Sequence, residues 1–290
     1  MREDLDKLSS IDIVKIMNEE DKTVAFIVER ELEKIAKAVD LIADSLEKGG
    51  RLFYFGAGTS GRMGLLDASE CPPTFGTHPQ LVQGVIAGGP AAFVEAVENA
   101  EDRPELGRED VRKCGVKKGD VAVGIAASGR TPYVLGALEE ALSREARTIS
   151  LSCTADTQIS SEVDVAINVA VGPEVVAGST RLKAGTAQKM VLNMLSTAAM
   201  IRLGKVYGNL MVSVQATNMK LVERVKRIIM EATGVSYDEA EKLAEKAGGD
   251  ARVAIVMQIT GLDSNKSLQL LERHKGRIRE AIDEFQKKSK

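Results

Sequence analysis

Residues 52–71 place an apolar stretch, a loop of small residues and a carboxylate in immediate succession. The apolar residues predict a strand, and the loop after it contains Gly58, Thr59 and Ser60. A glycine loop between a strand and a helix exposes backbone N–H groups at the positive end of the helix dipole, where a phosphate can bind. The two hydroxyls add further donors. Taken alone, the loop is equally compatible with a tight turn before a helix that Ser60 caps.

The same pattern recurs in the middle of the chain. Residues 121–126 are apolar and predict a strand, which Ser128 and Gly129 follow. Thr131 before Pro132 is typical of the first residues of another helix. Because the carboxyl ends of parallel strands meet at one edge of a sheet, the two loops can converge on one anion. Hydroxyls and backbone amides, without the lysine of a nucleotide-binding loop, favour a monophosphate ester over a triphosphate.

A third polar segment follows the last predicted strand. It contains Ser179 and Thr180, with Arg181 and Lys183 beside them. These side chains could close over a sugar or a phosphate, or they could form the solvated first turn of a helix. The sequence leaves both interpretations open.

Two glutamates are placed on apolar helical faces, as acid–base groups near such a site could be. Glu70 shares a helical face with Leu66, and Glu101 shares one with Val97 in a helix expected to begin at Pro90. Glu101 comes late in that helix, and the alternative position is the loop that follows it. A carboxylate on an apolar face loses solvation, which raises its pKa toward the range useful for proton transfer. The alternative is that both glutamates are boundary residues paired with nearby arginines.

Two further carboxylates are expected to play lesser parts. Asp67 is expected on the surface of its helix. Glu98, close to Glu101 in the sequence, is a weaker candidate for contact with a substrate.

Alternating strand and helix patterns position these residues. We expect strands near residues 52–56, 81–87, 120–126, 147–152 and 164–170. Short apolar runs separated by helical patterns are typical of a parallel sheet with helices on both faces. The predicted fold class is therefore α/β, a doubly wound, five-stranded, flavodoxin-like sheet that binds ligands at its carboxyl edge.

Helices are predicted both before and after the strand-forming part of the sequence. Before it, apolar residues spaced three and four apart from Val24 to Leu46 predict one long amphipathic helix, packed on the sheet or on a second subunit. After it, the pattern becomes purely helical and includes a capping box that begins at Ser236. We expect two domains, residues 1–217 and a small bundle of three or four helices over residues 218–290.

The composition excludes several classes of function. A net charge of −3 and 3% aromatic residues disfavour nucleic-acid binding, by charge and by base stacking respectively. Three scattered cysteines and two histidines disfavour a disulfide framework and a metal site. The charged N-terminus and the lack of a membrane-length apolar run predict a cytoplasmic protein without membrane contact.

Together these motifs resemble the signature of the N-acetylmuramic acid 6-phosphate etherase family. The resemblance lies in residues 55–75, continues through residues 83–89, 96–102 and 177–186, and extends over essentially the whole chain. It implies a sugar-isomerase (SIS) fold, usually in a homodimer, and a cytoplasmic role in recycling cell-wall sugars. Glucokinase regulatory protein is a distant relative with the same sugar-phosphate-binding loops.

The resemblance also implies a reaction. The D-lactyl ether of N-acetylmuramic acid 6-phosphate would be cleaved with water, giving N-acetylglucosamine 6-phosphate and D-lactate. By position in the motif, Glu70 would be the acid that protonates departing lactate, and Glu101 the base that removes the C2 proton. Elimination of the C3 oxygen and hydration of the unsaturated aldehyde need two carboxyl groups in opposite protonation states. No cofactor is expected.

Two other functions remain open. A phosphosugar aldose–ketose isomerase on the same fold would also abstract a C2 proton but would not expel a C3 ether. A non-catalytic sugar-phosphate sensor would keep the serine loops without needing Glu70 and Glu101. A transcriptional regulator is less compatible, because no basic helix-turn-helix precedes the sugar-binding region.

Overall fold

The computed structural model describes residues 4–95, 97, 99–155, 157–214 and 219–288. Its contacts divide the chain into two compact units. The first, the sheet unit, comprises residues 1–69 and 80–196, and the second, the helical unit, comprises residues 70–79 and 197–290. The predicted domain boundary between residues 217 and 218 lies outside the described residues, as does Glu98, so both remain predictions.

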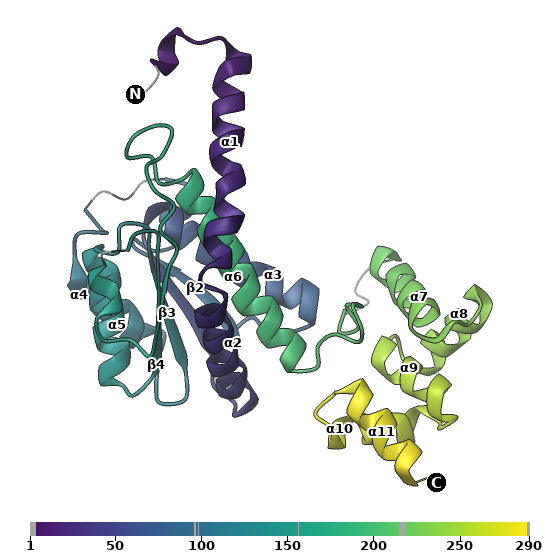
Figure 1. The fold of residues 1–290 in the computed structure, drawn as a ribbon. Coiled ribbons are helices and arrows are strands. Elements are labelled where there is room, and N and C mark those ends of the chain that lie inside the picture. The colour runs from purple at the N-terminus through teal and green to yellow at the C-terminus, as the bar shows by residue number, and fades with distance from the viewer. Residues whose placement is uncertain (1–3, 96, 98, 156, 215–218, 289–290) are drawn as a thin grey trace. The chain divides into compact units, whose positions relative to one another are not determined.

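A five-stranded parallel sheet forms the centre of the sheet unit, as predicted (Figure 1). The strands are β1 (Leu52–Gly56), β2 (Val82–Ile86), β3 (Val121–Ala126), β4 (Arg147–Ser152) and β5 (Val165–Asn168). Their order is β2-β1-β3-β4-β5, so the winding direction reverses between β1 and β3. In a doubly wound sheet this switch point is where ligands bind.

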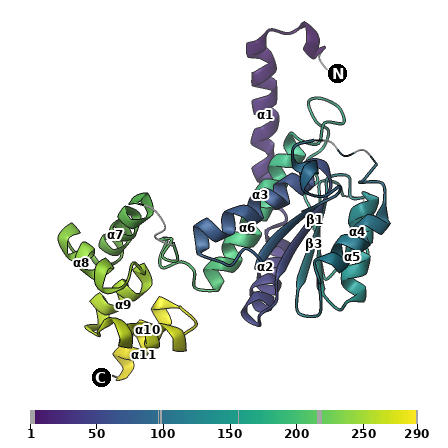
Figure 2. The ribbon, with the colours of Figure 1, turned by 180° about the vertical axis from the view of Figure 1, so that it is seen from behind.

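Helices cover both faces of the sheet, as Figures 1 and 2 show from opposite sides. One face carries α4 (Pro104–Lys113) and α5 (Pro132–Ser143), and the other carries α2 (Leu32–Glu47), α3 (Gly58–Phe75) and α6 (Lys183–Arg202). Short 3-10 helices lie at Leu5–Lys7, Pro90–Phe93 and Gln158–Ser160. This arrangement confirms the predicted doubly wound α/β fold.

The single long N-terminal helix that the apolar stripe predicts is wrong. The chain forms two helices, α1 (Ser10–Glu29) and α2, which meet at a turn around Glu31. The carboxylate of Glu31 accepts a hydrogen bond of 3.2 Å from the N–H of Asn168 at the end of β5 and pairs with Lys34. Because Glu31 is held by the sheet, α2 packs on it while α1 extends beyond it (Figure 1).

The helix expected to begin at Pro90 is far shorter than predicted, and Glu101 lies in the segment after it, which was the alternative placement. Only Pro90–Phe93 forms a 3-10 helix, and Glu101 lies in a turn just before α4. Asn99 has a φ of +61°, a conformation that no right-handed helix contains. The apolar stripe that suggested the helix is uncovered here, because Val97 is 43% exposed.

Asp67 is not a surface residue, contrary to the expectation. Its side chain is buried in the middle of α3 and accepts hydrogen bonds from the hydroxyl of Tyr54 in β1 at 3.0 Å and from two residues of α6. These are the amide of Asn193 at 2.7 Å and the hydroxyl of Ser196 at 3.0 Å. Burial raises the pKa of Asp67, and the hydrogen bonds oppose that rise. Asp67 therefore joins the sheet to two helices.

The helical unit contains five described helices rather than the predicted three or four. They are α7 (Met219–Thr233), α8 (Tyr237–Lys246), α9 (Ala251–Thr260), α10 (Ser264–Arg273) and α11 (Ile278–Lys288). α9 is buried on most sides and supplies much of the apolar core of this unit, to which the other helices also contribute. The predicted capping box is present, with Ser236 and Glu239 bonded to each other's backbone.

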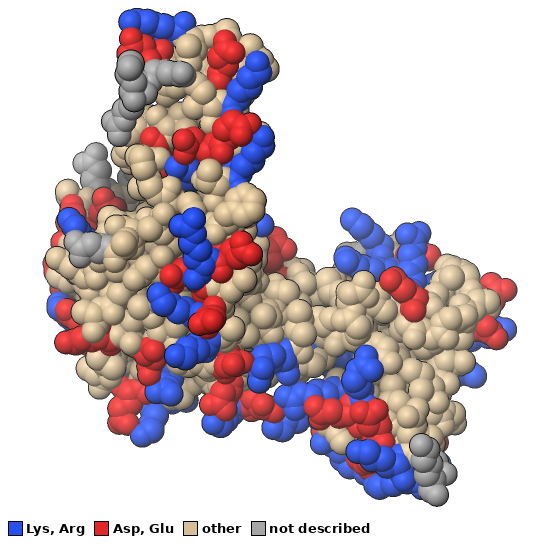
Figure 3. All heavy atoms as spheres, in the orientation of Figure 1, with Lys and Arg blue, Asp and Glu red and all other residues tan. Residues whose placement is uncertain are grey.

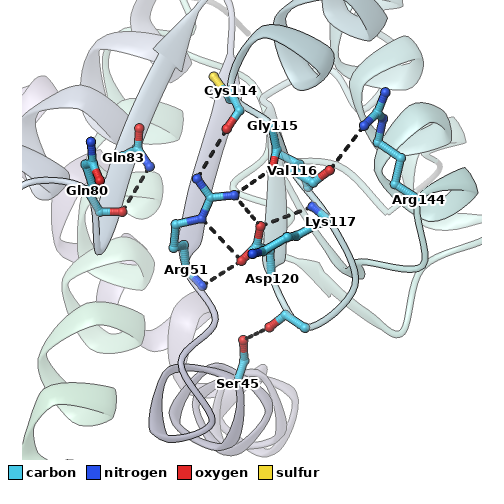
Figure 4. Close-up of polar contacts among 11 residues, drawn as sticks. Ser45, Arg51, Gln80, Gln83, Cys114, Gly115, Val116, Lys117, Asp120 and Arg144 are labelled. Carbon is cyan, nitrogen blue, oxygen red and sulfur yellow. Dashed lines mark hydrogen bonds and ion pairs between the residues drawn. The ribbon is translucent and has the colours of Figure 1, made fainter.

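An ion pair at the amino edge of the sheet fixes β1 against β3 (Figure 4). Asp120 is fully buried and accepts hydrogen bonds from the backbone N–H of Arg51 at 2.9 Å and from its guanidinium at 2.7 Å. It also accepts one from the N–H of Lys117, and the hydroxyl of Ser45 in α2 donates to the carbonyl of Gly119 next to it. This cluster ties the start of both strands together.

Charges of both signs are interspersed over the face of the sheet unit drawn in Figure 3. Such a mixed pattern agrees with the small net charge of the chain. Nucleic-acid binding typically requires a continuous field of one sign instead.

Replacing Asp120 with Ala is expected to lower the free energy of unfolding by about 3 kcal/mol, because it leaves several buried donors unpaired. The matched control is Asp44→Ala, which breaks the exposed pair with Lys48 and should cost about 0.5 kcal/mol or less. Urea titration followed by circular dichroism measures both. Equal effects for the two variants would contradict the special role of Asp120.

Candidate active site

The first turn of α3 begins directly at the end of β1. β1 ends at Gly56, and α3 starts at Gly58, whose φ of +52° suits glycine. A Cβ on Gly56 would lie 2.7 Å from the backbone N of Gly61, and one on Gly61 would lie 2.6 Å from a side-chain carbon of Ile86. Only glycine allows this approach, which brings the N-terminus of α3 to the carboxyl edge of the sheet.

The loop between β3 and α5 is shaped by Gly129, which has a φ of +68°. Its carbonyl oxygen accepts hydrogen bonds from the N–H groups of Gln158 and Ile159 and from the hydroxyl of Thr157. Thr131 stands immediately before α5, as predicted. Within the described residues its side chain makes no capping hydrogen bond, so its hydroxyl is available to a ligand.

A cavity of about 410 Å³ lies where these loops meet, and we call it the hydroxyl chamber. Its walls are formed by Ala57, Gly58, Thr59, Ser60, Glu101, Asp102, Ala127, Ser128, Arg130, Thr131, Pro132 and Thr180. Six of the eight residues predicted to bind phosphate therefore line one cavity. The other two, Gly129 and Ser179, are not among its lining residues. That the six bind phosphate remains a prediction.

Two predicted ligand-facing side chains are engaged within the protein. The hydroxyl of Ser60 donates to Gln188 of α6 at 3.1 Å, which ties the first turn of α3 to α6. Lys183 does not close over the site, because its side chain is buried and its ammonium pairs with Glu20 of α1 at 2.5 Å. In addition, Glu174 accepts hydrogen bonds from the first N–H groups of α6, including that of Lys183.

A second cavity of about 410 Å³ adjoins the first, and we call it the side chamber. Its own lining residues are Arg62, Ala87, Ala92, Val97, Asn99 and Ala100. It shares Ala57, Gly58, Glu101 and Asp102 with the hydroxyl chamber. Glu101 thus lines both chambers.

Glu70 lines neither chamber, although its helix starts at the hydroxyl chamber. It is 12 residues beyond Gly58 in α3, a rise of about 18 Å at 1.5 Å per residue. Its side chain is exposed, and it is not among the residues that line either chamber. Glu101 is exposed as well, so the predicted desolvation by an apolar face is wrong for both glutamates.

Arg62 lines the side chamber, although the residues predicted from the sequence do not include it as a candidate. Its guanidinium donates to the carbonyl oxygens of Phe93 at 2.8 Å and Ala92 at 2.9 Å. These bonds hold the 3-10 helix that follows β2 against α3. The signal was present, because Arg62 directly follows the first glycine loop.

Among the described residues, no group of three or more His, Cys, Asp or Glu side chains is arranged to hold a metal ion. Nor does any described helix combine the length and the apolar character needed to cross a membrane.

Comparisons with family models place the SIS architecture on the sheet unit. Residues 34–142 match the glucokinase regulatory protein N-terminal SIS domain, and residues 109–198 match the SIS domain. Among solved structures, phosphoheptose isomerase GmhA from Neisseria gonorrhoeae covers 66% of this chain and 99% of its own, with a TM-score of 0.53 and 21% identity. A phosphoheptose isomerase from Francisella tularensis covers 67% and 100%, with a TM-score of 0.54 and 20% identity. These likenesses show the fold.

Relatives at higher identity span nearly the whole chain. The N-acetylmuramic acid 6-phosphate etherase of Mycolicibacterium smegmatis is 56% identical over 279 residues, covering 96% of this chain and 94% of the relative. The protein of that name from Clostridioides difficile is 53% identical and covers 98% and 93%.

Gly129→Ala is expected to weaken binding of a sugar 6-phosphate roughly tenfold or more, because a misplaced loop loses several hydrogen bonds at once. A Cβ there would lie 2.4 Å from the hydroxyl oxygen of Thr157, so the loop must shift. The control is Gly119→Ala, which has a φ of +93° but nothing within 4 Å and lies at the opposite edge of the sheet. Isothermal titration calorimetry should show unchanged affinity for the control. Equal losses in both variants would indicate general strain instead.

Proposed function

The chain belongs to the family of N-acetylmuramic acid 6-phosphate etherases, and from this premise we propose how its two chambers serve the reaction. The protein is an enzyme, a carbon–oxygen lyase that cleaves the D-lactyl ether of N-acetylmuramic acid 6-phosphate to N-acetylglucosamine 6-phosphate and D-lactate. The observation that carries the proposal is the position of Glu101, which lines both chambers.

The hydroxyl chamber takes the phosphate of the substrate. Its donors are the hydroxyls of Thr59, Ser128, Thr131 and Thr180, together with the N-termini of α3 and α5. Helix N-termini and hydroxyls bind a phosphate without a lysine. Arg130, which also lines this chamber, adds a positive charge.

The side chamber takes the part of the substrate that carries the lactyl ether. The lactyl group ends in a carboxylate, and Arg62 supplies a guanidinium in the wall of this chamber. The Nε and Nη2 groups of Arg62 donate to the carbonyls of Phe93 and Ala92, so its Nη1 group and its positive charge would meet the carboxylate. With the phosphate in one chamber and the lactyl group in the other, the reacting carbons lie between them, beside Glu101.

Glu101 acts as the base. In the open-chain sugar it removes the proton from C2, which is alpha to the aldehyde, and the C–H electrons form a double bond between C2 and C3. The bond from C3 to the lactyl oxygen breaks, and that oxygen receives a proton from the acid and leaves as D-lactate. Water then adds its hydroxyl to C3 while a proton returns to C2. No oxidant or reductant is consumed in this sequence.

Glu70 acts as the acid, and we place it in the site of a second subunit. It shares a face of α3 with Leu66, which is 47% exposed and so leaves an apolar surface beside the glutamate. A second copy of the chain that covers this face would bring Glu70 to the other copy's chambers. The enzyme is therefore proposed to work as a homodimer with shared sites.

The cellular setting follows from the substrate. Muramic acid is a sugar of the bacterial cell wall, and we place the reaction in the cytoplasmic recycling of such sugars. An aldose–ketose isomerase would use the same chambers and the same base, but it would release no lactate. The high identity to etherases over the full chain favours ether cleavage.

Incubation with N-acetylmuramic acid 6-phosphate in heavy-oxygen water, with EDTA present, tests the reaction. We expect D-lactate to be released without the label and N-acetylglucosamine 6-phosphate to carry it, because water adds to C3 of the sugar. Mass spectrometry of both products measures this. Label in lactate would indicate displacement at the lactyl carbon, and tight sugar-phosphate binding without turnover would indicate a sensor.

Variants of the two glutamates test their roles. Glu101→Gln should abolish both deuterium exchange at C2 and lactate release, with losses of about 10²–10⁴-fold that are typical of a missing general base. Glu70→Gln should abolish lactate release but retain exchange at C2. NMR of the C2 proton and an enzymatic lactate assay separate the two steps.

Mixing the two inactive variants tests whether the site is shared. Random reassociation makes half of the dimers hybrids, each with one intact site, so the mixture should recover about a quarter of the wild-type activity. Neither variant alone should recover any. If both glutamates served the site of their own chain, the mixture would recover no activity, although each variant alone would still be inactive as predicted.

A further inference from the structure

Lys205 in the helical unit has no acidic partner among the described residues. The residue follows α6 and is half-buried. Within the residues that the structure describes, its ammonium makes no ion pair or hydrogen bond. Burial lowers the pKa of Lys205, and the nearby positive charge of Arg252 lowers it further. Charged groups that leave water are normally paired, so an unpaired one points to a missing partner.

Lys205 and Arg252 line one cavity of about 370 Å³, together with Ser213, Gly248, Gly249 and Asp250. Its volume falls at the lower end of the range of about 300–1,000 Å³ that is typical of small-molecule sites. All of its lining residues belong to the helical unit, and none of them lines the hydroxyl chamber or the side chamber.

The carboxylate in this cavity is already engaged. Asp250 caps α9 by accepting from the N–H of Arg252 at 2.8 Å, and it binds the guanidinium of the same residue at 2.6 and 3.1 Å. These bonds fix the plane of the guanidinium and neutralise one of the two positive charges. Counting Asp250, Lys205 and Arg252, the cavity retains one uncompensated positive charge.

We propose that this cavity binds a small phosphate-bearing anion between the ammonium of Lys205 and the guanidinium of Arg252. The planar guanidinium of Arg252 and the compact ammonium of Lys205 can each bind different oxygens of one phosphate. The anion would supply the counter-charge that Lys205 lacks. The inference does not depend on the proposed reaction, because it uses no residue of either chamber.

Protection of Lys205 from acylation provides a local readout. The full chain is treated with limiting acetic anhydride, and labelling of each lysine is followed by peptide mass spectrometry. Inorganic phosphate should slow labelling of Lys205 in a saturable way, whereas chloride at the same ionic strength should not. Lys266, which is exposed, serves as the internal control. Binding of phosphate in the hydroxyl chamber would not produce this signal.

Variants of Arg252 separate binding from structure. Arg252→Met should weaken the protection by phosphate roughly tenfold or more and also slow the basal labelling of Lys205, because a neighbouring positive charge is lost. Arg252→Lys should retain most of the protection. Arg273→Met, which removes an exposed arginine paired with Glu284 outside the cavity, should behave as wild type. Circular dichroism identifies any variant that fails to fold.

The source of the phosphate is resolved by comparing two probes. Stronger protection by glycerol 3-phosphate than by inorganic phosphate would assign the site to phosphate monoesters, and the reverse order would assign it to inorganic phosphate. No protection by either probe beyond that of chloride would overturn the proposal. So would equal protection in wild type and in a folded Arg252→Met variant.

Discussion

The ion pair between Arg51 and Asp120 is the constraint on which the site depends. It sits at the amino edge of the sheet and fixes β1 against β3 with Leu52 opposite Val121. Both strands are buried along their whole length, so a one-residue slip would turn every side chain to the wrong face. With this register, Gly56 lies opposite Ile125, and the two loops leave the far edge side by side. The hydroxyl chamber is the result.

A second constraint holds the helices to the same edge. Gly56 and Gly61 let α3 start in backbone contact with β1, and Asp67 then ties α3 to the sheet and to α6. A buried carboxylate is costly unless its oxygens are bonded, which three donors achieve here. These hydrogen bonds fix the position of α3 relative to α6. Thr59 and Thr180 come from segments more than a hundred residues apart, yet they line one chamber because α3 and α6 are held together.

The sequence predicted what short-range patterns determine. Apolar runs located all five strands, and glycine–hydroxyl loops located the walls of the hydroxyl chamber, because both signals lie within a few neighbouring residues. The errors arose where distant residues decide. Periodicity cannot reveal that Glu31 is held by β5, that Asp67 has partners in α6, or that Asn99 leaves the helical region of φ. The family resemblance assigned chemistry to Glu70 and Glu101 but could not place them in space.

The length of α3 explains why the two glutamates separate. Its first turn lines the hydroxyl chamber, and Glu70 lies about 18 Å further along the same helix. A hexose is far shorter than this rise, so with the phosphate in the hydroxyl chamber, as proposed, Glu70 of the same chain would not reach the ether oxygen of that substrate. Glu101, the proposed base, lies in a turn at the carboxyl edge of the sheet and lines the hydroxyl chamber itself. In the proposed mechanism the acid Glu70 would therefore serve the site of a neighbouring copy, and catalysis would depend on assembly.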